Sequence, residues 1–351
     1  MAHVIRVALA ALLTFLLAAA FAYGGLIETS PHDFAVLAGG ALSADQHVTV
    51  DGLAGAVGNM WLDQGVAVTG GAYTLGTFGG DRHVVIGGPV VAGGNVWLDQ
   101  RAVVGSVAAG GGAGLARDVT VTGPIAAARR LDIDRGSLVR GDASYGTEAW
   151  VHASATIEGD LGQDLLSVDR WAPTLIDEPV SWNSLAGSTY YARGADVALA
   201  PDVCGGLNMD RDGTLRLTAG TYDLGSVWLG RDAHVVADTS AGDVHVYIAG
   251  SLSADRGTTF ETTGGGSLVF LADASVSLGR GVQADAGFYS FGTLGVETDG
   301  HITGRLYSAG DMWLGQDVEV QGLGPGHLPE PATLALVLAG AGFLLHRRRR
   351  G

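Results

Sequence analysis

The sequence predicts an all-β protein, a single-stranded parallel β-helix (β-solenoid) with about 18 residues per coil. Small or apolar residues recur at every sixth position, a second such series follows two residues later, and glycines recur two residues after that. Each six-residue unit is therefore expected to form a short strand with two inward side chains, followed by a corner. Three units make one coil, and coils stacked at roughly 4.8 Å bury an interior that one coil cannot bury alone.

Both inward series run for fourteen repeats, which favours a regular stack over chance. The first series is Leu42, Val48, Ala54, Met60, Val66, Ala72, Phe78, Val84, Val90, Val96, Ala102, Ala108, Gly114 and Thr120. The second is Ala44, Val50, Ala56, Leu62, Val68, Thr74, Gly80, Ile86, Ala92, Leu98, Val104, Gly110, Ala116 and Thr122. The expected corner glycines are Gly52, Gly58, Gly70, Gly76, Gly88, Gly94 and Gly112.

The period divides the chain into segments. We expect a signal peptide at 1–22, a lead-in at 23–40, a regular solenoid at 41–141, an irregular excursion at 142–206, a solenoid continuation at 207–321, a linker at 322–328 and a sorting signal at 329–351. In the excursion the six-residue period fails and prolines and aromatic residues gather, Trp150, Trp171 and Trp182 among them. One helix is expected there, near Asp160 to Arg170.

Composition limits the partners. The chain has 57 Gly in 351 residues, no Lys, and a net charge of −16. Such a surface repels nucleic acid and anionic lipid, so DNA and RNA binding are excluded. A single cysteine, Cys204, can form neither an internal disulfide nor a zinc site, and we expect a buried small residue there.

The N-terminus has the pattern of a secretory signal. Arg6 precedes an apolar run from Val7 to Phe21, and small residues at Ala20 and Ala22 place cleavage after Ala22. A signal anchor that stays in the membrane is the alternative, although the run is short for one. The mature protein is thus expected outside the cytoplasm.

Three features follow one another at the C-terminus. Pro329, Glu330 and Pro331 come first, then an apolar run from Ala332 to Leu345, then Arg347, Arg348, Arg349 and Arg350. This order resembles the PEP-CTERM sorting signal of Gram-negative bacteria. The resemblance implies recognition by an exosortase and the secretion machinery, a transient inner-membrane anchor formed by a short transmembrane helix, cleavage near Pro329, and delivery to the cell surface or extracellular matrix. An ordinary tail anchor is the alternative.

The repeat style carries two further resemblances. Segments such as Val244 to Gly250 and Gly304 to Gly310 look like β-helical parts of bacterial surface adhesins, and the first half is similar to polymer-forming bactofilins. Left-handed hexapeptide helices commonly place glycine directly after the aliphatic residue. Here glycine lies two places later, so we expect a right-handed coil.

Four tryptophans are candidate binding residues: Trp61, Trp97, Trp228 and Trp313. Each lies between two inward residues, so its ring should face outward. Trp61 and Trp97 are two coils apart, about 9.6 Å along the axis from the strand spacing. That distance is close to a disaccharide repeat, and aromatic rings stack on the apolar faces of sugars, which suggests an exopolysaccharide. The alternative is packing, in which each ring covers a glycine such as Gly79 in the adjacent coil.

A second outward column consists of Asp45, Asp63, Asp81 and Asp99. Like charges about 4.8 Å apart repel, so something must offset them. Calcium held between carboxylates is one hypothesis. The other is a solvated edge, in which each Asp accepts hydrogen bonds within its own turn and His47, His83 and Arg101 lie beside the column. Apart from this candidate calcium, no cofactor is expected.

The sequence therefore predicts a secreted, non-enzymatic surface or matrix protein of adhesin-like or structural type. One alternative is a bactofilin-like protein that self-associates end to end, because an open solenoid end exposes unpaired strand edges. Another is a glycan-active enzyme, a lyase or hydrolase. Asp210, Arg211 and Asp212 are the nearest catalytic candidates, although a charged turn is the usual explanation for such a sequence.

Overall fold

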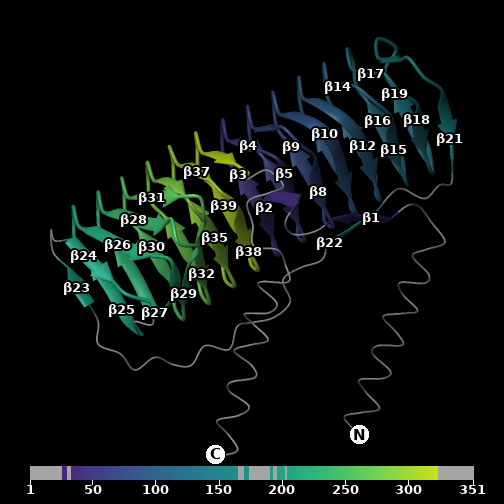
Figure 1. Cartoon of the computed structure of the whole chain (residues 1–351). Helices are drawn as coiled ribbons and strands as arrows, with labels where there is room; N and C mark the ends of the chain where they lie inside the picture. Colours follow the sequence, from purple (N-terminus) through teal and green to yellow (C-terminus); the bar gives the residue numbers. More distant parts are fainter. Residues whose placement is uncertain are drawn as a thin grey trace, which may run out of the picture. The chain divides into compact units, whose positions relative to one another are not determined.

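The computed structural model describes residues 26–29, 33–164, 170–173, 190–192, 196–201 and 204–322, and at 26–29, 170–173, 190–192 and 204 it describes the backbone alone. Every regular element in these residues is a β-strand (Figure 1). Within them no helix is long and apolar enough to cross a membrane. The signal peptide at 1–22 and the sorting signal at 329–351 lie outside the described residues.

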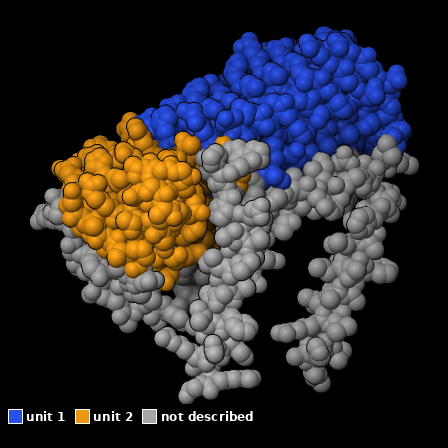
Figure 2. Space-filling view, in the orientation of Figure 1, with its two compact units in different colours: residues 1–176, 293–301, 306–321 blue, residues 177–292, 302–305, 322–351 orange. Residues whose placement is uncertain are grey.

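The chain forms two compact units (Figure 2). Unit 1 comprises Met1–Ile176, Thr293–His301 and Leu306–Gln321, and unit 2 comprises Asp177–Gly292, Ile302–Arg305 and Gly322–Gly351. Both are stacks of parallel strands, so the predicted parallel β-solenoid is confirmed.

Three series of short strands build unit 1, and each series forms one face. The first face consists of β36 (Leu294–Val296), β39 (Met312–Leu314), β3 (Leu42–Ala44), β6 (Met60–Leu62), β9 (Phe78–Gly80), β11 (Val96–Leu98), β13 (Ala113–Leu115), β16 (Arg130–Ile133) and β19 (Glu148–Val151). The second consists of β40 (Glu319–Gln321), β4 (Thr49–Asp51), β7 (Ala67–Val68), the start of β10 (Val85–Ala92), the start of β12 (Val103–Ala109), β14 (Thr120–Val121), β17 (Leu138–Val139) and β20 (Thr156–Ile157). The third consists of β38 (Leu306–Ser308), β2 (Phe34–Ala38), β5 (Leu53–Ala56), β8 (Ala72–Thr74), the ends of β10 and β12, β15 (Ile125–Ala127), β18 (Ala143–Tyr145) and β21 (Leu161–Gln163).

The predicted inward registers are confirmed from Leu42 to Val104. Each strand pairs with its counterpart in the next coil, as in Leu42 with Met60 and Met60 with Phe78. All residues of both series in this range are buried. The residues between them are exposed or partly exposed on the first two faces, except Gly79, whereas on the third face Tyr73 and Val91 are buried as well. The interior is thus a stack of mainly Val, Ala, Leu and Met side chains, whose burial stabilises the stack by roughly 25 cal/mol for each Å² of apolar area.

The registers are wrong after Val104, because one coil is a residue shorter than the others. Val85 pairs with Val103, in step with the period, but Val90 pairs with Val107 where the period requires Ala108. This one-residue change turns the alternate side chains to the opposite side of the strand. The buried residues become Val107, Ala109, Ala113, Leu115, Val119 and Val121. Ala108, Gly110, Ala116, Thr120 and Thr122 of the predicted series are partly or fully exposed instead.

The first coil of the N-terminal segment stacks on the last coil of the C-terminal segment. Val36 pairs with Leu306, Leu42 with Met312, and Thr49 with Glu319. The coil formed by β2, β3 and β4 is therefore paired on all three faces with the coil formed by β38, β39 and β40. The expected lead-in at 23–40 therefore contains a solenoid strand, β2. Sequence periodicity indicates which residues face inward, but it does not indicate which coil lies beside which when the two are far apart in the chain.

The corner glycines have a steric role. A Cβ on Gly76 would lie 2.6 Å from the carbonyl oxygen of Gly58, and one on Gly58 would lie 2.9 Å from the backbone of Gly40. Of the expected corner glycines, only Gly52 has a positive φ, at 136°. Glycine is needed at these corners mainly because the backbones of adjacent coils approach each other closely.

Unit 2 contains longer coils. Its strands are β23 (Tyr190–Ala192), β24 (Asp196–Leu199), β25 (Cys204–Met209), β26 (Thr214–Thr218), β27 (Gly220–Leu229), β28 (His234–Thr239), β29 (Val244–Ile248), β30 (Leu252–Ala254), β31 (Thr259–Gly264), β32 (Leu268–Ala272), β33 (Val276–Leu278), β34 (Gln283–Asp285) and β35 (Gly287–Ser290). His234 and Thr259 are neighbours in adjacent coils at a separation of 25 residues. Ser251 and Ser275 are neighbours at a separation of 24 residues. Of β37 (His301–Thr303), His301 belongs to unit 1 and the other two residues belong to unit 2.

The excursion expected at 142–206 is shorter in the structure. Ala143 pairs with Ile125 and with Leu161, so the stack of unit 1 continues through β21. At the other end, β23 already pairs with β25. The helix expected near Asp160 to Arg170 is wrong for the described residues, because β21 occupies Leu161–Gln163 and β22 (Arg170–Pro173) begins at Arg170. β22 pairs in parallel with β1 (Leu26–Thr29). Trp182 and residues 165–169 lie outside the described residues.

Candidate functional site

Tryptophan rings project from the first face of unit 1. Trp61 and Trp97 lie at the middle of three-residue strands whose other two residues are buried, so alternation directs both rings outward as predicted. Trp61 is 52% exposed and Trp97 is 49% exposed. Rings of this size are seldom left half exposed in a soluble protein without a reason, which makes this face the candidate site.

The structure places Trp313 in the same column. Trp313 pairs with Ser43, and Ser43 pairs with Trp61, so Trp313 lies two coils before Trp61. Trp61 in turn pairs with Gly79, and Gly79 pairs with Trp97. Three of the four candidate tryptophans therefore form one column in which a ring alternates with a small residue. Trp313 is 40% exposed.

Trp150 belongs to this column too, although the sequence assigned it to the excursion. The column continues from Trp97 to Gly114, then to Asp132 and then to Trp150, which is 48% exposed. It lies three coils beyond Trp97, whereas the other rings are two coils apart. A strict six-residue count from Trp97 does not reach Trp150, because the coil that contains Ser106 is one residue shorter and shifts every later position by one.

Trp228, the fourth candidate, lies in unit 2. It is 41% exposed, and its neighbours in the adjacent coils are Asn208 and Ser253. These pairings place Trp228 in the stack of unit 2, with a polar residue beside it in each adjacent coil.

The rings also pack on glycine, as the alternative explanation predicted. A Cβ on Gly79 would overlap two atoms of the Trp61 ring, so that ring extends over Gly79. The Trp97 ring extends over Gly114 in the same way and in the same direction along the stack. Packing and exposure coexist here. Contact with the sheet restrains each ring, while about half of its surface stays open to solvent.

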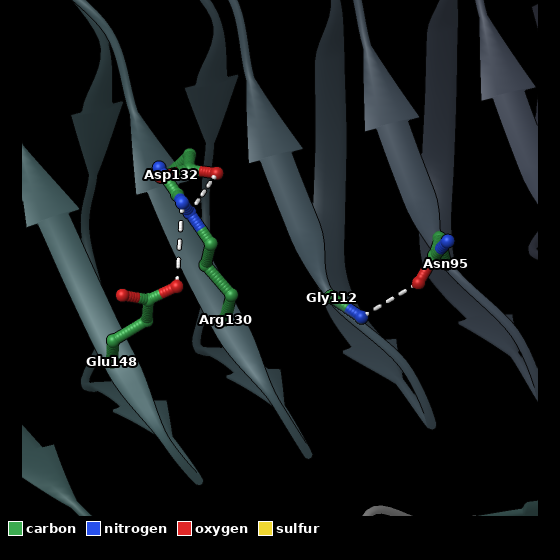
Figure 3. A network of polar contacts seen from close by, with 5 residues as sticks. All are labelled: Asn95, Gly112, Arg130, Asp132 and Glu148. Carbon is green, nitrogen blue, oxygen red and sulfur yellow. Dashed lines mark hydrogen bonds and ion pairs between the residues drawn. The ribbon is translucent and has the colours of Figure 1, made fainter.

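Asparagine side chains border the column on the side where the strands begin. Asn59 precedes β6, and its Oδ1 accepts the backbone N–H of Thr77 at 2.9 Å. Asn95 precedes β11, and its Oδ1 accepts the backbone N–H of Gly112 at 2.8 Å. Figure 3 shows the amide nitrogen of Asn95 pointing away from Gly112. Both Asn residues are exposed, so their NH₂ groups are available as donors at the edge of the column.

The predicted Asp column borders the opposite side, where the strands end. The carboxylate of Asp63 accepts the backbone N–H of Gln64 at 2.7 Å, and that of Asp81 accepts the N–H of Arg82 at 2.7 Å. The same bond recurs at Asp134. These carboxylates cap their own turns, as the solvated-edge hypothesis predicted, and calcium along the column stays a prediction.

The pKa of Asp81 is lowered below its ordinary value of 3.8. Burial acts to raise it, but this effect is outweighed by the hydrogen bond from Arg82 N–H, by side-chain hydrogen bonds with Asp63 and Asp99, and by the charge of Arg82.

The turns also contain a conformation that the sequence analysis did not predict. In most described coils one residue adopts a left-handed φ near 60°, and several of these residues are not glycine: His47, His83, Arg101, Asp118, Asp299 and Asp317 in unit 1, and Asp212 and Asp232 in unit 2. Glycine occupies the equivalent place at Gly65 and Gly136. Glycine alternates with His, Arg and Asp at this turn position, and because glycine adopts a positive φ easily, its recurrence was the one sequence signal for the conformation.

The catalytic candidates form a turn. The N–H of Arg211 donates to Asp210 Oδ1 at 2.9 Å, and Asp212 has a φ of 59°. In the described part of the chain, no three His, Cys, Asp or Glu side chains gather closely enough to hold a metal ion.

A charged group interrupts the column between Trp97 and Trp150. The Nε of Arg130 lies 2.7 Å from Asp132 Oδ2, and its Nη1 lies 3.3 Å from Glu148 Oε1 (Figure 3). Asp132 occupies the column position where Ser43 and Gly79 stand elsewhere. The alternation of ring and small neutral residue therefore ends at Gly114.

Fold and site together define the class of protein, a parallel β-solenoid that carries an exposed aromatic column. No protein-family model matches the chain, and no curated protein sequence matches it. Its structure is similar to that of an ice-binding protein from an Antarctic bacterium of the Flavobacteriaceae, with 13% sequence identity and a TM-score of 0.30, over 85% of this chain and 98% of that one. A likeness this distant says nothing about the ligand.

Proposed function

We propose that this chain is a secreted, non-enzymatic surface or matrix protein whose stacked coils present tryptophan rings to an extracellular polysaccharide. The observation that carries the proposal is the column of Trp313, Trp61 and Trp97, held at two-coil intervals and about half exposed. Aromatic faces stack on the apolar faces of sugar rings, and the regular spacing suits a polymer better than a single small molecule.

The restraint on the rings favours binding. Trp61 rests over Gly79 and Trp97 over Gly114, so each ring has lost conformational freedom before a ligand arrives. Pre-organisation lowers the entropy cost of binding, which for a free rotamer-rich side chain is about 0.5–1.5 kcal/mol. The contact that packs the ring therefore also prepares it for a ligand.

The test is co-sedimentation of the full chain with the exopolysaccharide of the producing cell. The chain should sediment with the polymer, and the double variant Trp61→Leu/Trp97→Leu should stay largely in the supernatant. Leucine keeps apolar cover over the glycines but has no aromatic face. Equal sedimentation of both proteins would count against the tryptophans, and no sedimentation of the unaltered chain would refute the proposed function.

The route to the cell surface is part of the proposal. The pattern of Pro329, Glu330, Pro331, an apolar run and four arginines supports recognition by an exosortase after export by the N-terminal signal. Changing Pro329 and Pro331 to Ala should leave the chain in the inner membrane, detected by fractionation and immunoblotting. Normal release of that variant would contradict exosortase sorting but would leave the glycan-binding proposal untouched.

A further inference from the structure

The strip of unit 1 from Trp313 to Gly114 has a composition that selects among polysaccharides. We define the strip as six successive outward positions on the first face: Trp313, Ser43, Trp61, Gly79, Trp97 and Gly114. None of these residues is charged, and a ring alternates with a small residue along the whole strip. Trp313 comes from the C-terminal end of the described chain and the other five residues come from its N-terminal part, so the strip is complete only where the C-terminal coil stacks on the first coil.

The spacing of the rings fixes the repeat that would match them. Successive rings are two coils apart, which is about 9.6 Å at the ordinary strand spacing. This length is close to one disaccharide in an extended glycan, in which every second sugar presents the same face. In a glycan that lay along the stack, every second sugar would therefore stack on one of the rings of Trp313, Trp61 and Trp97, always with the same face. Trp150 lies three coils beyond Trp97 and is out of step with this repeat.

The borders of the strip fix the charge of the ligand. On one side lie the exposed amides of Asn59 and Asn95, and on the other lie the carboxylates of Asp63, Asp81 and Asp99. Amides and carboxylates both form hydrogen bonds with sugar hydroxyls. A row of carboxylates on a chain with a net charge of −16 repels an anionic polymer.

We propose that the strip binds an uncharged polysaccharide in an extended conformation, aligned with the stack, with one disaccharide for every two coils. The inference rests on the proposed function and adds three properties of the ligand: its lack of charge, its orientation along the stack, and the match between its disaccharide repeat and two coils. Stacking on three rings supplies the affinity, and the Asn and Asp borders hold the polymer over the rings and exclude acidic polymers.

Affinity electrophoresis of the full chain tests this inference. Native gels would contain either a neutral polymer (hydroxyethylcellulose, xylan or a soluble β-1,3-glucan) or an anionic one (alginate or polygalacturonate). The chain should be retarded by at least one neutral polymer and by neither anionic one. Trp61→Leu, Trp97→Leu and Trp313→Leu should each weaken binding by roughly threefold to tenfold, from the strength of one aromatic contact.

One matched variant serves as the control, because it removes an equally exposed ring that is out of step with the repeat. Trp150→Leu should change binding by less than about twofold. Unchanged thermal unfolding of each variant would separate loss of binding from loss of folding.

The outcomes separate this inference from the proposed function. Retardation by an anionic polymer, equal losses from Trp150→Leu and Trp61→Leu, or no loss from Trp313→Leu would overturn the inference. So would retardation by no neutral polymer. In each of these cases the proposed function stands if the chain still sediments with the exopolysaccharide of the producing cell, and it fails if the chain does not.

Discussion

Units 1 and 2 are stacks of the same kind but differ in coil length. Neighbours in adjacent coils of unit 1 are separated by 17 or 18 residues, as at Asn95 with Gly112 and at Asn59 with Thr77. In unit 2 the separation ranges from 18 residues, at Phe270 with Phe288, to 24 or 25 residues. The extra residues lengthen the strands, as in β31 with six residues against two in β7. A longer coil encloses a wider interior, and that interior needs larger side chains to fill it.

The cores of the two units follow this difference. In unit 2, Phe260, Phe270 and Phe288 are fully buried and their ring centroids lie 5.2 to 5.5 Å apart. In unit 1 the coil that starts at Met60 buries only Met60, Leu62, Val66, Val68, Ala72 and Thr74 in its inward series. The coils of unit 1 keep a strict six-residue period and are filled mainly by aliphatic residues, with Phe78 as a larger buried side chain. Unit 2 has a looser period and a cluster of three phenylalanine rings in its core.

The largest expected effect is the loss of an aromatic ring from the wide core. Phe270 stacks on Phe288 at 5.5 Å and meets Phe260 edge to face at 5.3 Å. Phe270→Ala should reduce the free energy of unfolding by about 3–5 kcal/mol. Denaturant unfolding measures the loss, and hydrogen exchange should place it in peptides of unit 2. A loss below about 1 kcal/mol would mean that the cluster contributes little to the core.

The converse change should damage the narrow core. Ala72 is fully buried, and Ala72→Phe should cost about 1–3 kcal/mol or more, because the surrounding side chains and backbone must move. Ala67→Phe is the control, since Ala67 points outward from β7. If both variants unfold like the unaltered chain, the interior of unit 1 has more room than the structure indicates.

Corner glycines allow a smaller test of the stacking distance. Gly76→Ala places a Cβ 2.6 Å from the carbonyl oxygen of Gly58, so a loss of about 0.5–3 kcal/mol is expected. Gly265→Ala is the matched change in unit 2, where the new Cβ has no neighbour within 4 Å. Melting temperatures of the two variants should differ, and similar values would remove the steric explanation of the corner glycines.

The two units should respond to acid in different pH ranges. Burial lowers the pKa of His245 in unit 2 below its ordinary 6.5, and the charge of Asp243 opposes this only in part. The unfolded chain then binds more protons just below pH 6.5, so unit 2 loses stability as the pH falls through that range. Asp81 in unit 1 has a pKa below 3.8, so the stability it provides is present above that pH and is lost below it.

Single substitutions separate these two effects. His245→Gln should flatten the fall in unfolding free energy between pH 7.5 and 5.5, and Asp81→Asn should flatten the fall below about pH 4. Urea unfolding across this pH series, with hydrogen exchange to assign the unit, measures both. If both variants keep the pH profile of the unaltered chain, other groups control its acid response.

The same difference explains what the sequence could predict. The strict six-residue period between Leu42 and Val104 predicted the inward residues of this part of unit 1 correctly. The coils there have a constant length, so the same positions of each repeat always face the interior. The predicted registers are wrong beyond Ser106, where one coil is a residue shorter, since a one-residue slip exchanges the two sides of a strand. The predicted end of the regular stack, at Gly141, is also too early, because β18 to β21 continue the stack with fewer buried residues.

The candidate site was predictable in part. Outward orientation of Trp61, Trp97, Trp228 and Trp313 follows from alternation, and all four are exposed. The assembly of Trp313 with Trp61 was not predictable, because it depends on the pairing of β39 with β3, which come from opposite ends of the described chain. The left-handed turn residues were missed because His, Arg and Asp do not by themselves signal a positive φ.

The pairing of the C-terminal coil with the first coil is the central claim, and a disulfide tests it most directly. Thr49 and Glu319 are paired neighbours on the second face, at a Cα spacing that a disulfide can bridge. In a Cys204→Ser background, Thr49→Cys/Glu319→Cys should cross-link under mild oxidation and migrate faster on a non-reducing gel. Thr156→Cys/Glu319→Cys, several coils apart, should stay reduced. Failure of the first pair to cross-link, or equal cross-linking of both, would contradict the stacking that creates the tryptophan strip.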